Sequence, residues 1–232
     1  MEFENFSIAI DNKKLIIDFN GRFANGETTV IVGPNGCGKS TFAHGVMGRS
    51  DITVGGKLHL NDTNILDLET DERAREGIFV SWQTPPEISG ITSFGLIRDV
   101  KQITGKQMAA ELKSFKGLIS DVDLPSDWAN RQVNVGGSGG ERKRAEMVNL
   151  MSIDPRVAIL DEIDTGLDTN GLKMVSEIIN KRRADGKINL VITHNKNLLD
   201  HLEFDNGYVF RLGTLQQVSP DEIKETLTHG YK

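Results

Sequence analysis

A glycine-rich segment near the N-terminus has the residue types and spacing of a phosphate-binding loop. Residues 33–40 read Gly-Pro-Asn-Gly-Cys-Gly-Lys-Ser and fill the template G-x-x-x-x-G-K-[ST]. Glycines let the backbone curl until successive N–H groups point at phosphate oxygens, and a following helix adds about half a positive charge at its N-terminus. The residues predicted to contact a nucleotide are Gly33, Pro34, Asn35, Gly36, Cys37, Gly38, Lys39, Ser40 and Thr41.

Individual side chains of this segment have distinct expected roles. We expect Lys39 to reach the β- and γ-phosphates, Ser40 to coordinate Mg²⁺ and Thr41 to contact the α-phosphate. The alternative is a glycine-rich turn with a chance lysine. The flanking sequence disfavours that alternative, because Thr28–Val32 is a β-branched run and a helical pattern begins at about Lys39. We interpret Cys37 as a small tolerated side chain and not as a catalytic or redox thiol.

Two carboxylates follow a second apolar run. Residues 157–160 read Val-Ala-Ile-Leu and lead directly into Asp161 and Glu162. Open α/β sheets bind ligands at the carboxyl ends of their strands. Asp161 suits Mg²⁺, because a hard cation prefers carboxylate oxygen, and Glu162 could orient or deprotonate an attacking water. Acid pairs are common at strand-to-loop junctions, but together with the phosphate-binding loop this pair favours a site that binds a phosphate-containing ligand with Mg²⁺ and activates water.

Composition excludes several other functions. Lys and Arg number 27 against 33 Asp and Glu, a net charge of −6, which argues against general nucleic-acid binding. No apolar run approaches the ~20 residues of a membrane-spanning helix, so we expect no direct membrane insertion. The single cysteine, Cys37, cannot form an internal disulfide or alone hold an iron–sulfur cluster. We expect a cytoplasmic location, or the stroma or matrix if the chain is encoded in a eukaryotic organelle.

The elements that must position these residues are predicted to form an α/β fold. Alternation in Phe3–Ile10 and Leu15–Phe23 predicts an antiparallel β layer at the start of the chain. Helical patterns cover Met108–Leu118, Glu141–Leu150 and Leu172–Arg183, the last with one apolar face. The strands predicted for the core are Thr28–Val32, Gly77–Trp82, Arg156–Leu160 and Asn189–Thr193.

Strand signals fade between Gln83 and about Met151. We therefore predict a single domain over residues 1–232, with an α/β core formed by 1–83 and 152–232 and an inserted helical subdomain over 84–151. Two short basic runs, residues 142–144 and 181–183, are interpreted as solvated helix faces.

Several further motifs, in the same order along the chain, resemble those of the ABC ATPases. Ser138-Gly139-Gly140 resembles the signature motif, with Glu141 where glutamine is commoner. Gln83 resembles the Q-loop glutamine, residues 165–168 (Thr-Gly-Leu-Asp) the D-loop, and His194 the switch histidine. The resemblance implies a P-loop NTPase core with ATP and Mg²⁺ as cofactors. It assigns catalysis to Gln83, Glu162 and His194, further nucleotide contacts to Ser138, Gly139, Gly140 and Asp168, and Mg²⁺ binding to Ser40, Gln83 and Asp161.

The resemblance also implies how such domains work. Two copies pack head to tail, so that the phosphate-binding loop of one and Ser138–Gly140 of the other enclose one ATP. ATP-dependent homodimerisation and its reversal after hydrolysis then form an open–close cycle.

Finer sequence features are similar to the SufC family, the ATPase subunits of the SUF iron–sulfur cluster assembly systems. The similar segments are residues 77–91, 141–144, 159–168, 192–200 and 230–231. This implies partners of the SufB/SufD type, with Gln83–Ile91 as the expected docking segment. Two positions depart from the wider family. Gly137 replaces a larger apolar residue, and Ile10 stands where many members stack an aromatic ring on adenine.

Two other functions remain open at this point. The chain could be the nucleotide-binding subunit of an ABC importer, which docks on transmembrane partners through the same region. It could also be a non-hydrolysing regulatory scaffold, although the intact set of Lys39, Asp161, Glu162 and His194 argues against that.

Overall fold

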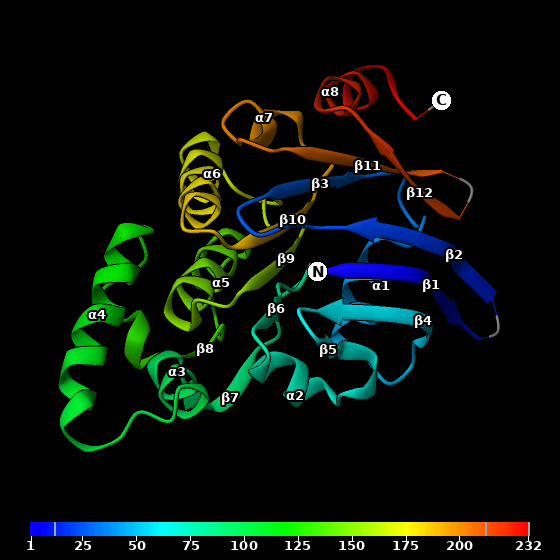
Figure 1. Ribbon diagram of the computed structural model, residues 1–232. Helices are drawn as coiled ribbons and strands as arrows, with labels where there is room; N and C mark the ends of the chain where they lie inside the picture. Colours follow the sequence, from blue (N-terminus) through cyan, green and yellow to red (C-terminus); the bar gives the residue numbers. More distant parts are fainter. Residues whose placement is uncertain (12, 212, 232) are drawn as a thin grey trace.

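The computed structural model describes residues 1–11, 13–211 and 213–231 and arranges them around two β-sheets (Figure 1). The larger sheet has the strand order β12-β11-β3-β10-β9-β6. Its strands run parallel except for β12, which pairs antiparallel with β11. The bounds are β3 (Thr28–Val32), β6 (Ile78–Val80), β9 (Val157–Asp161), β10 (Ile188–Ile192), β11 (Asn206–Arg211) and β12 (Thr214–Val218).

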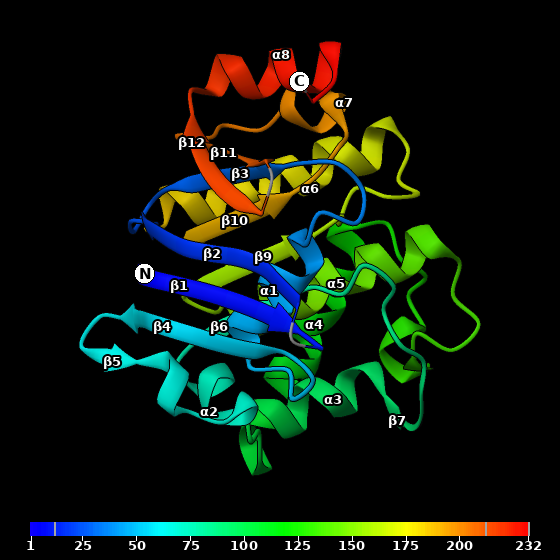
Figure 2. The ribbon, with the colours of Figure 1, turned by 90° about the vertical axis from the view of Figure 1, so that its right-hand side faces the viewer.

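The smaller sheet is antiparallel and lies beside the first, as Figure 2 shows. Its strand order is β2-β1-β4-β5, and register shifts interrupt the pairing of β1 with both neighbours. This sheet confirms the antiparallel layer predicted from the N-terminal alternation. The bounds are β1 (Glu2–Ile10), β2 (Lys13–Arg22), β4 (Thr53–Leu60) and β5 (Thr63–Asn64).

Alternate side chains of the larger sheet enter two different apolar clusters, as strand geometry requires. Val30 and Val32 of β3 pack with the helices α5 (Gly139–Ile153), α6 (Thr169–Ala184), α7 (Lys196–Leu199) and α8 (Pro220–His229). Ile31 faces the other way, toward α1 (Lys39–Met47) and the antiparallel sheet. Aromatic rings fill this second cluster, with the centroids of Phe3 and Phe6 5.0 Å apart. The sheet is thus buried on both faces, and its strand ends are fixed in place.

The remaining elements lie to one side of the larger sheet in Figure 1. They include α2 (Thr70–Arg75), α3 (Ser93–Val100) and α4 (Met108–Asp121). The expectation that strands fade after Gln83 was incomplete, because β7 (Ile88–Thr92) pairs antiparallel with β8 (Gln132–Val133). The pairing joins residues far apart in sequence, which a local pattern does not reveal. Short 3₁₀ turns cover Ile65–Asp67, Gly105–Gln107 and Trp128–Asn130.

The two basic runs are not simple solvated faces, so that interpretation was wrong for their central residues. Lys143 and Arg182 are only 3% and 5% exposed. Arg182 donates through Nε to Asn189 Oδ1 at 3.0 Å and through Nη2 to the Pro155 carbonyl at 3.0 Å. A long cationic side chain can be buried when fixed acceptors satisfy its donors, and a run of like charges does not show where those acceptors will be.

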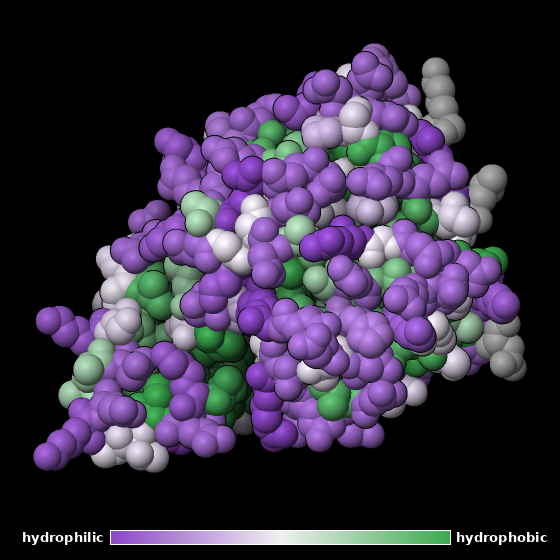
Figure 3. All heavy atoms as spheres, in the orientation of Figure 1, coloured by the Kyte–Doolittle hydropathy of each residue, from purple (hydrophilic) through white to green (hydrophobic). Residues whose placement is uncertain are grey.

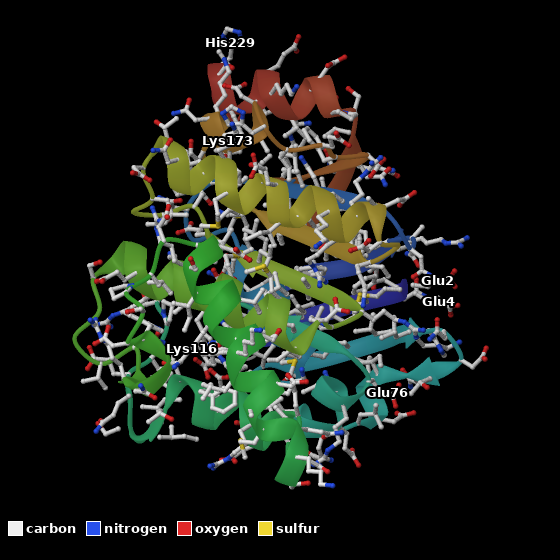
Figure 4. The ribbon with its side chains drawn as sticks, turned by 90° about the vertical axis from the view of Figure 1, so that its left-hand side faces the viewer. Glu2, Glu4, Glu76, Lys116, Lys173 and His229 are labelled. Atoms are coloured by element: carbon white, nitrogen blue, oxygen red, sulfur yellow. The ribbon has the colours of Figure 1, made fainter. Side chains whose placement is uncertain are left out.

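The outer surface is mainly hydrophilic in the view of Figure 3. Charged side chains such as Lys116 of α4 and Lys173 of α6 project from it (Figure 4). Of the helices that the structure describes, none has both the length and the apolar character needed to cross a membrane.

Candidate active site

The predicted phosphate-binding loop joins β3 to α1. Gly38 is the N-cap of α1, with φ of 113°, and Gly36 has φ of 76°. Residues other than glycine rarely adopt positive φ angles of this size. Because Gly38 contributes no side-chain cap, the first N–H groups of α1 stay free of a capping side chain. The start of this helix therefore has the character of an anion site.

Lys39 is the cation of this loop. Its Nζ donates to the carbonyl oxygens of Gly33 at 2.8 Å and Pro34 at 2.9 Å, and the side chain is buried. Gly33 must be small, since an added Cβ would lie 2.6 Å from the Cβ of Phe210 and 2.9 Å from the Sγ of Cys37. Neutral carbonyls are weaker acceptors than phosphate oxygens, so an arriving phosphate competes well for the ammonium group.

Asp161 ends β9 and is fully buried. Its backbone N–H donates to the Ser81 hydroxyl at 2.9 Å. Both carboxylate oxygens are buried and accept no hydrogen bond from the residues that the structure describes. Burial raises the pKa of Asp161, and the neighbouring Ser40 side chain opposes that shift. Buried oxygens without a donor suit a hard cation, so the residues fit Mg²⁺, which commonly uses one or two carboxylates together with substrate phosphates.

Glu162 has a backbone conformation unusual for its residue type. Its φ is 47°, in the left-handed region, while its N–H still donates to the Ile192 carbonyl at 2.9 Å. Its Oε2 accepts a hydrogen bond from Nε2 of Gln83 at 2.8 Å, and its Oε1 lies 3.4 Å from Nδ1 of His194. Strained angles of this kind cost about 1–3 kcal/mol and are concentrated at functional sites.

The fold explains why these three side chains meet. Gln83, Glu162 and His194 follow β6, β9 and β10, which are adjacent parallel strands. Parallel strands present their carboxyl ends at one edge of the sheet. The structure thus brings together the three residues predicted to be catalytic and sets them next to Asp161.

The signature segment begins α5. Ser138 is the N-cap, its hydroxyl accepts from the N–H of Glu141 at 3.3 Å, and the Glu141 carboxylate accepts from the N–H of Ser138 at 2.8 Å. The Ser138 N–H lowers the pKa of Glu141. The glutamate at position 141 therefore completes a capping box with Ser138.

Trp128 explains the glycine that precedes the signature. A Cβ on Gly137 would lie 2.8 Å from the buried ring of Trp128. The ring fills the volume that a larger apolar residue would need. Arg142 donates from Nε to the Gly137 carbonyl at 2.8 Å and also pairs with Glu87. The Arg142–Glu87 ion pair thus links the expected docking segment to α5, the helix that begins at the signature segment.

Asp168 is the N-cap of α6 and accepts from the N–H of Gly171 at 2.8 Å. Nη2 of Arg144, in α5, lies 3.4 Å from Oδ1 of Asp168. An added Cβ on Gly140 would lie 3.2 Å from the Gly166 carbonyl. The D-loop therefore packs against the signature segment of the same chain.

Four buried polar residues near the site were missed by sequence reasoning. Glu146 has its pKa raised to about 7 by burial, and burial lowers the pKa of Lys143. Asp164 accepts from the Thr193 hydroxyl at 3.1 Å, and its pKa is raised by burial. Ser81 holds Asp161 as described. The position of Ser81, two residues before Gln83, was the available signal, whereas the burial of Lys143 and Glu146 depends on tertiary packing.

Two hollows flank Trp82, whose side chain is 47% exposed. One has a volume of about 170 Å³ and lies between the Gln83 segment, α3 and α5. The other has about 350 Å³ and lies toward α1, where the ring of His44 is 5.1 Å from that of Trp82. Figure 3 shows a recess with hydrophobic side chains between the α3–α4 region and the rest of the molecule.

Known proteins resemble this chain in sequence over most of its length. A sequence profile of the family described as ABC transporter matches residues 16–165. A probable ABC transporter ATP-binding protein of Streptococcus pyogenes serotype M3 is 37% identical over 224 residues, covering 93% of this chain and 86% of the relative. Vegetative protein 296 of Bacillus subtilis strain 168 is 35% identical over 237 residues, covering 98% and 90%.

Solved structures share the fold. A dimeric ATP-binding cassette in a post-hydrolysis state, bound to ADP and phosphate, matches with a TM-score of 0.78 at 20% identity, covering 94% of this chain and 97% of that one. The predicted α/β fold class is thereby confirmed.

Proposed function

This chain belongs to the ABC transporter family of ATP-binding domains, an ATPase family that uses ATP with Mg²⁺, and we propose that it drives iron–sulfur cluster assembly on SufB/SufD-like partners. The hydrolytic part of the proposal depends on one observation, the contact of Gln83 and His194 with Glu162 beside Asp161.

In the proposed reaction Glu162 polarises the attacking water. Its position at the end of β9 places a carboxylate next to the phosphate-binding loop, and His194 and Gln83 orient that carboxylate from two sides. Lys39 and the N-terminus of α1 bind the phosphates and stabilise the charge that develops on them. General-base assistance of this kind contributes about 10²–10⁴-fold.

Ser40, Gln83 and Asp161 would hold Mg²⁺. The cation neutralises phosphate charge and supplies Lewis-acid polarisation. The buried Asp161 carboxylate contributes the charged oxygen, and Ser81 fixes the strand end that carries it.

We propose further that two chains complete each site. Ser138 lies at the exposed start of α5, where its hydroxyl and the following N–H groups can face the nucleotide of a second copy. A solved relative of the same fold is a dimer, which supports the arrangement. The isolated chain is then a slow, mostly monomeric ATPase, since its net charge of −6 opposes self-association. A partner that holds two copies raises their effective concentration and accelerates hydrolysis.

The SUF assignment is supported by the sequence similarity at residues 77–91, 159–168 and 230–231. The hollows beside Trp82 offer a partner an apolar surface contiguous with Gln83, and we propose that the partner docks there. In this proposal residues 84–151 act as a helical subdomain that carries both the docking surface and the signature segment.

A second candidate is the nucleotide-binding subunit of an ABC importer. It is favoured by the relative named as a probable ABC transporter ATP-binding protein. The two candidates differ in the partner, because an importer subunit binds membrane-spanning chains.

An untagged purification from the source cell, with and without detergent, followed by mass spectrometry separates them. The proposal expects co-eluting SufB/SufD-like proteins without detergent. Co-elution of membrane-spanning subunits, seen only with detergent, would establish the importer function instead.

A further inference from the structure

The peptide groups on both sides of Trp82 are held by two charged residues of α5. The Trp82 N–H donates to Oε1 of Glu146 at 2.8 Å. The Trp82 carbonyl accepts from Nζ of Lys143. Nζ of Lys143 also lies 3.6 Å from Oε2 of Glu146. We call Lys143 and Glu146 the clamp residues. The next residue in the chain after Trp82 is Gln83, whose side-chain amide donates to Glu162.

Both clamp residues are buried, with 3% and 5% of Lys143 and Glu146 exposed. Burying an ion pair is costly, and a well-packed apolar pair is often at least as stable. Oε2 of Glu146 accepts no hydrogen bond from the residues that the structure describes, so the pair is not optimised for stability alone. Among the described residues, the hydrogen bond that the Glu146 carboxylate does accept comes from the backbone N–H of Trp82, next to Gln83.

We propose that Glu146 is a positioning residue for ATP hydrolysis, holding the Trp82 backbone so that the Gln83 amide stays on Glu162. The inference depends on the proposed catalytic roles of Gln83 and Glu162. The contact through which Glu146 acts is its hydrogen bond with the backbone N–H of Trp82, the residue before Gln83. It also lines the hollow of about 170 Å³, so one carboxylate faces both the docking surface and the backbone of the catalytic loop.

Two conservative substitutions distinguish positioning from a merely structural ion pair. Glu146→Gln keeps the length of the side chain and a carbonyl oxygen for the Trp82 N–H, but loses the charge beside Lys143. Glu146→Asp keeps the charge but withdraws the acceptor by one methylene. If Glu146 positions the Trp82 backbone, Glu146→Gln should retain most of kcat. In Glu146→Asp kcat should fall roughly tenfold or more, because misplacement of a catalytic group by about 1 Å can lower the rate up to about 10²-fold. An ion-pair role expects the reverse order.

A second readout does not involve turnover. Amide hydrogen exchange of the peptide covering residues 80–85 should be faster in Glu146→Asp than in wild type, and near wild type in Glu146→Gln. ATP affinity should change little in either variant, because the phosphate-binding loop is untouched. Glu177→Gln on the exposed face of α6 is the matched control and should change neither exchange nor kcat.

Normal exchange at residues 80–85 in a folded Glu146→Asp protein overturns the proposal, as does wild-type kcat in that variant. A failure of the catalytic role proposed for Glu162 can be told apart from a failure of the role proposed for Glu146. If Glu162→Gln retains turnover, the role of Glu162 is wrong, whereas the exchange result still decides whether Glu146 fixes the backbone before Gln83.

Discussion

Gln83 donates a hydrogen bond of 2.8 Å from its Nε2 to Oε2 of Glu162. The two residues are 79 positions apart, and the contact links the loop after β6 to the residue proposed to polarise water. A shift of the Gln83 segment therefore alters the surroundings of the catalytic carboxylate directly. Since the same segment borders the hollows beside Trp82, the proposed docking surface and the proposed catalytic carboxylate share one short stretch of backbone.

Replacing Glu162 by glutamine should keep ATP binding and remove most hydrolysis. The glutamine carbonyl can still accept from Gln83, but the negative charge that polarises water is lost. We expect kcat to fall by about 10²–10⁴-fold. ATP-binding titrations and single-turnover assays measure the two effects, with Glu177→Gln as a control that should alter neither. Turnover close to wild type in Glu162→Gln would rule out the assigned role.

Ser138→Arg should abolish activity without weakening ATP binding to the monomer, because Ser138 is proposed to contact the nucleotide of a second chain. Loss of the helix cap also costs about 1 kcal/mol, so thermal unfolding is monitored alongside. Mixing Ser138→Arg with Lys39→Ala places both lesions in one composite site and leaves the other normal. Partial recovery of ATPase activity is the expected result. If Ser138→Arg alone weakens ATP binding as strongly as Lys39→Ala, the two-chain site is refuted.

Ile10→Tyr should strengthen ATP binding. Ile10 ends β1 and is only partly buried, against the same apolar cluster as Cys37 of the phosphate-binding loop. An aromatic ring adds a stacking surface worth about 1 kcal/mol or more per base, so affinity should rise roughly fivefold or more. Isothermal titration with ATP measures it. Tyrosine at the exposed Ile17 of β2 is the control, and an unchanged affinity in Ile10→Tyr would place adenine elsewhere.

The strands of the larger sheet and the residues at their carboxyl ends could be predicted, because their signals are local. Thr28–Val32 is the same segment in sequence and structure, and Val157–Asp161 differs from its prediction by one residue at each end. Short apolar or β-branched runs that are bounded by glycine or polar residues indicate buried parallel strands. The meeting of Gln83, Glu162 and His194 follows from that arrangement.

The contacts behind the site could not be predicted, because they depend on tertiary packing. Lys143 lies in a run of three basic residues that looks solvated, yet α5 turns it toward the Trp82 carbonyl. The β7–β8 pair joins Ile88 to Val133, 45 positions along the chain, with the helices α3 and α4 between the two strands. Gly137 is explained only by the position of Trp128.

Val100→Asp should weaken partner binding and partner stimulation while basal hydrolysis stays unchanged. Val100 is 52% exposed on α3, lines the hollow of about 170 Å³, and lies outside the catalytic residues. A charge there must be desolvated when an apolar partner surface docks. Pull-down of SufB/SufD-like partners and stimulated ATPase assays measure the effect. Ile17→Asp, at an exposed apolar residue of β2 in the antiparallel sheet, is the matched control, and equal loss in both would show that the hollow is not the docking surface.

Glu146 should make the stability of the protein depend on pH in a direction opposite to that of an ordinary paired carboxylate. Burial raises its pKa from 4.5 to about 7, although Lys143 partly opposes the shift and Asp161 of β9 adds to it. Between those two values the folded chain binds more protons than the unfolded chain, so the contribution of Glu146 to stability falls as pH rises.

Glu146→Gln removes that titration. Its free energy of unfolding relative to wild type should therefore rise between about pH 5 and about pH 8, by on the order of 2 kcal/mol, since one pKa unit corresponds to about 1.4 kcal/mol. Urea unfolding at the two pH values measures the difference. Glu177→Gln, whose side chain is 67% exposed, controls for the loss of one surface charge and should show no such trend. A relative stability of Glu146→Gln that stays flat or falls with rising pH would mean that Glu146 is ionised at little cost in the folded protein.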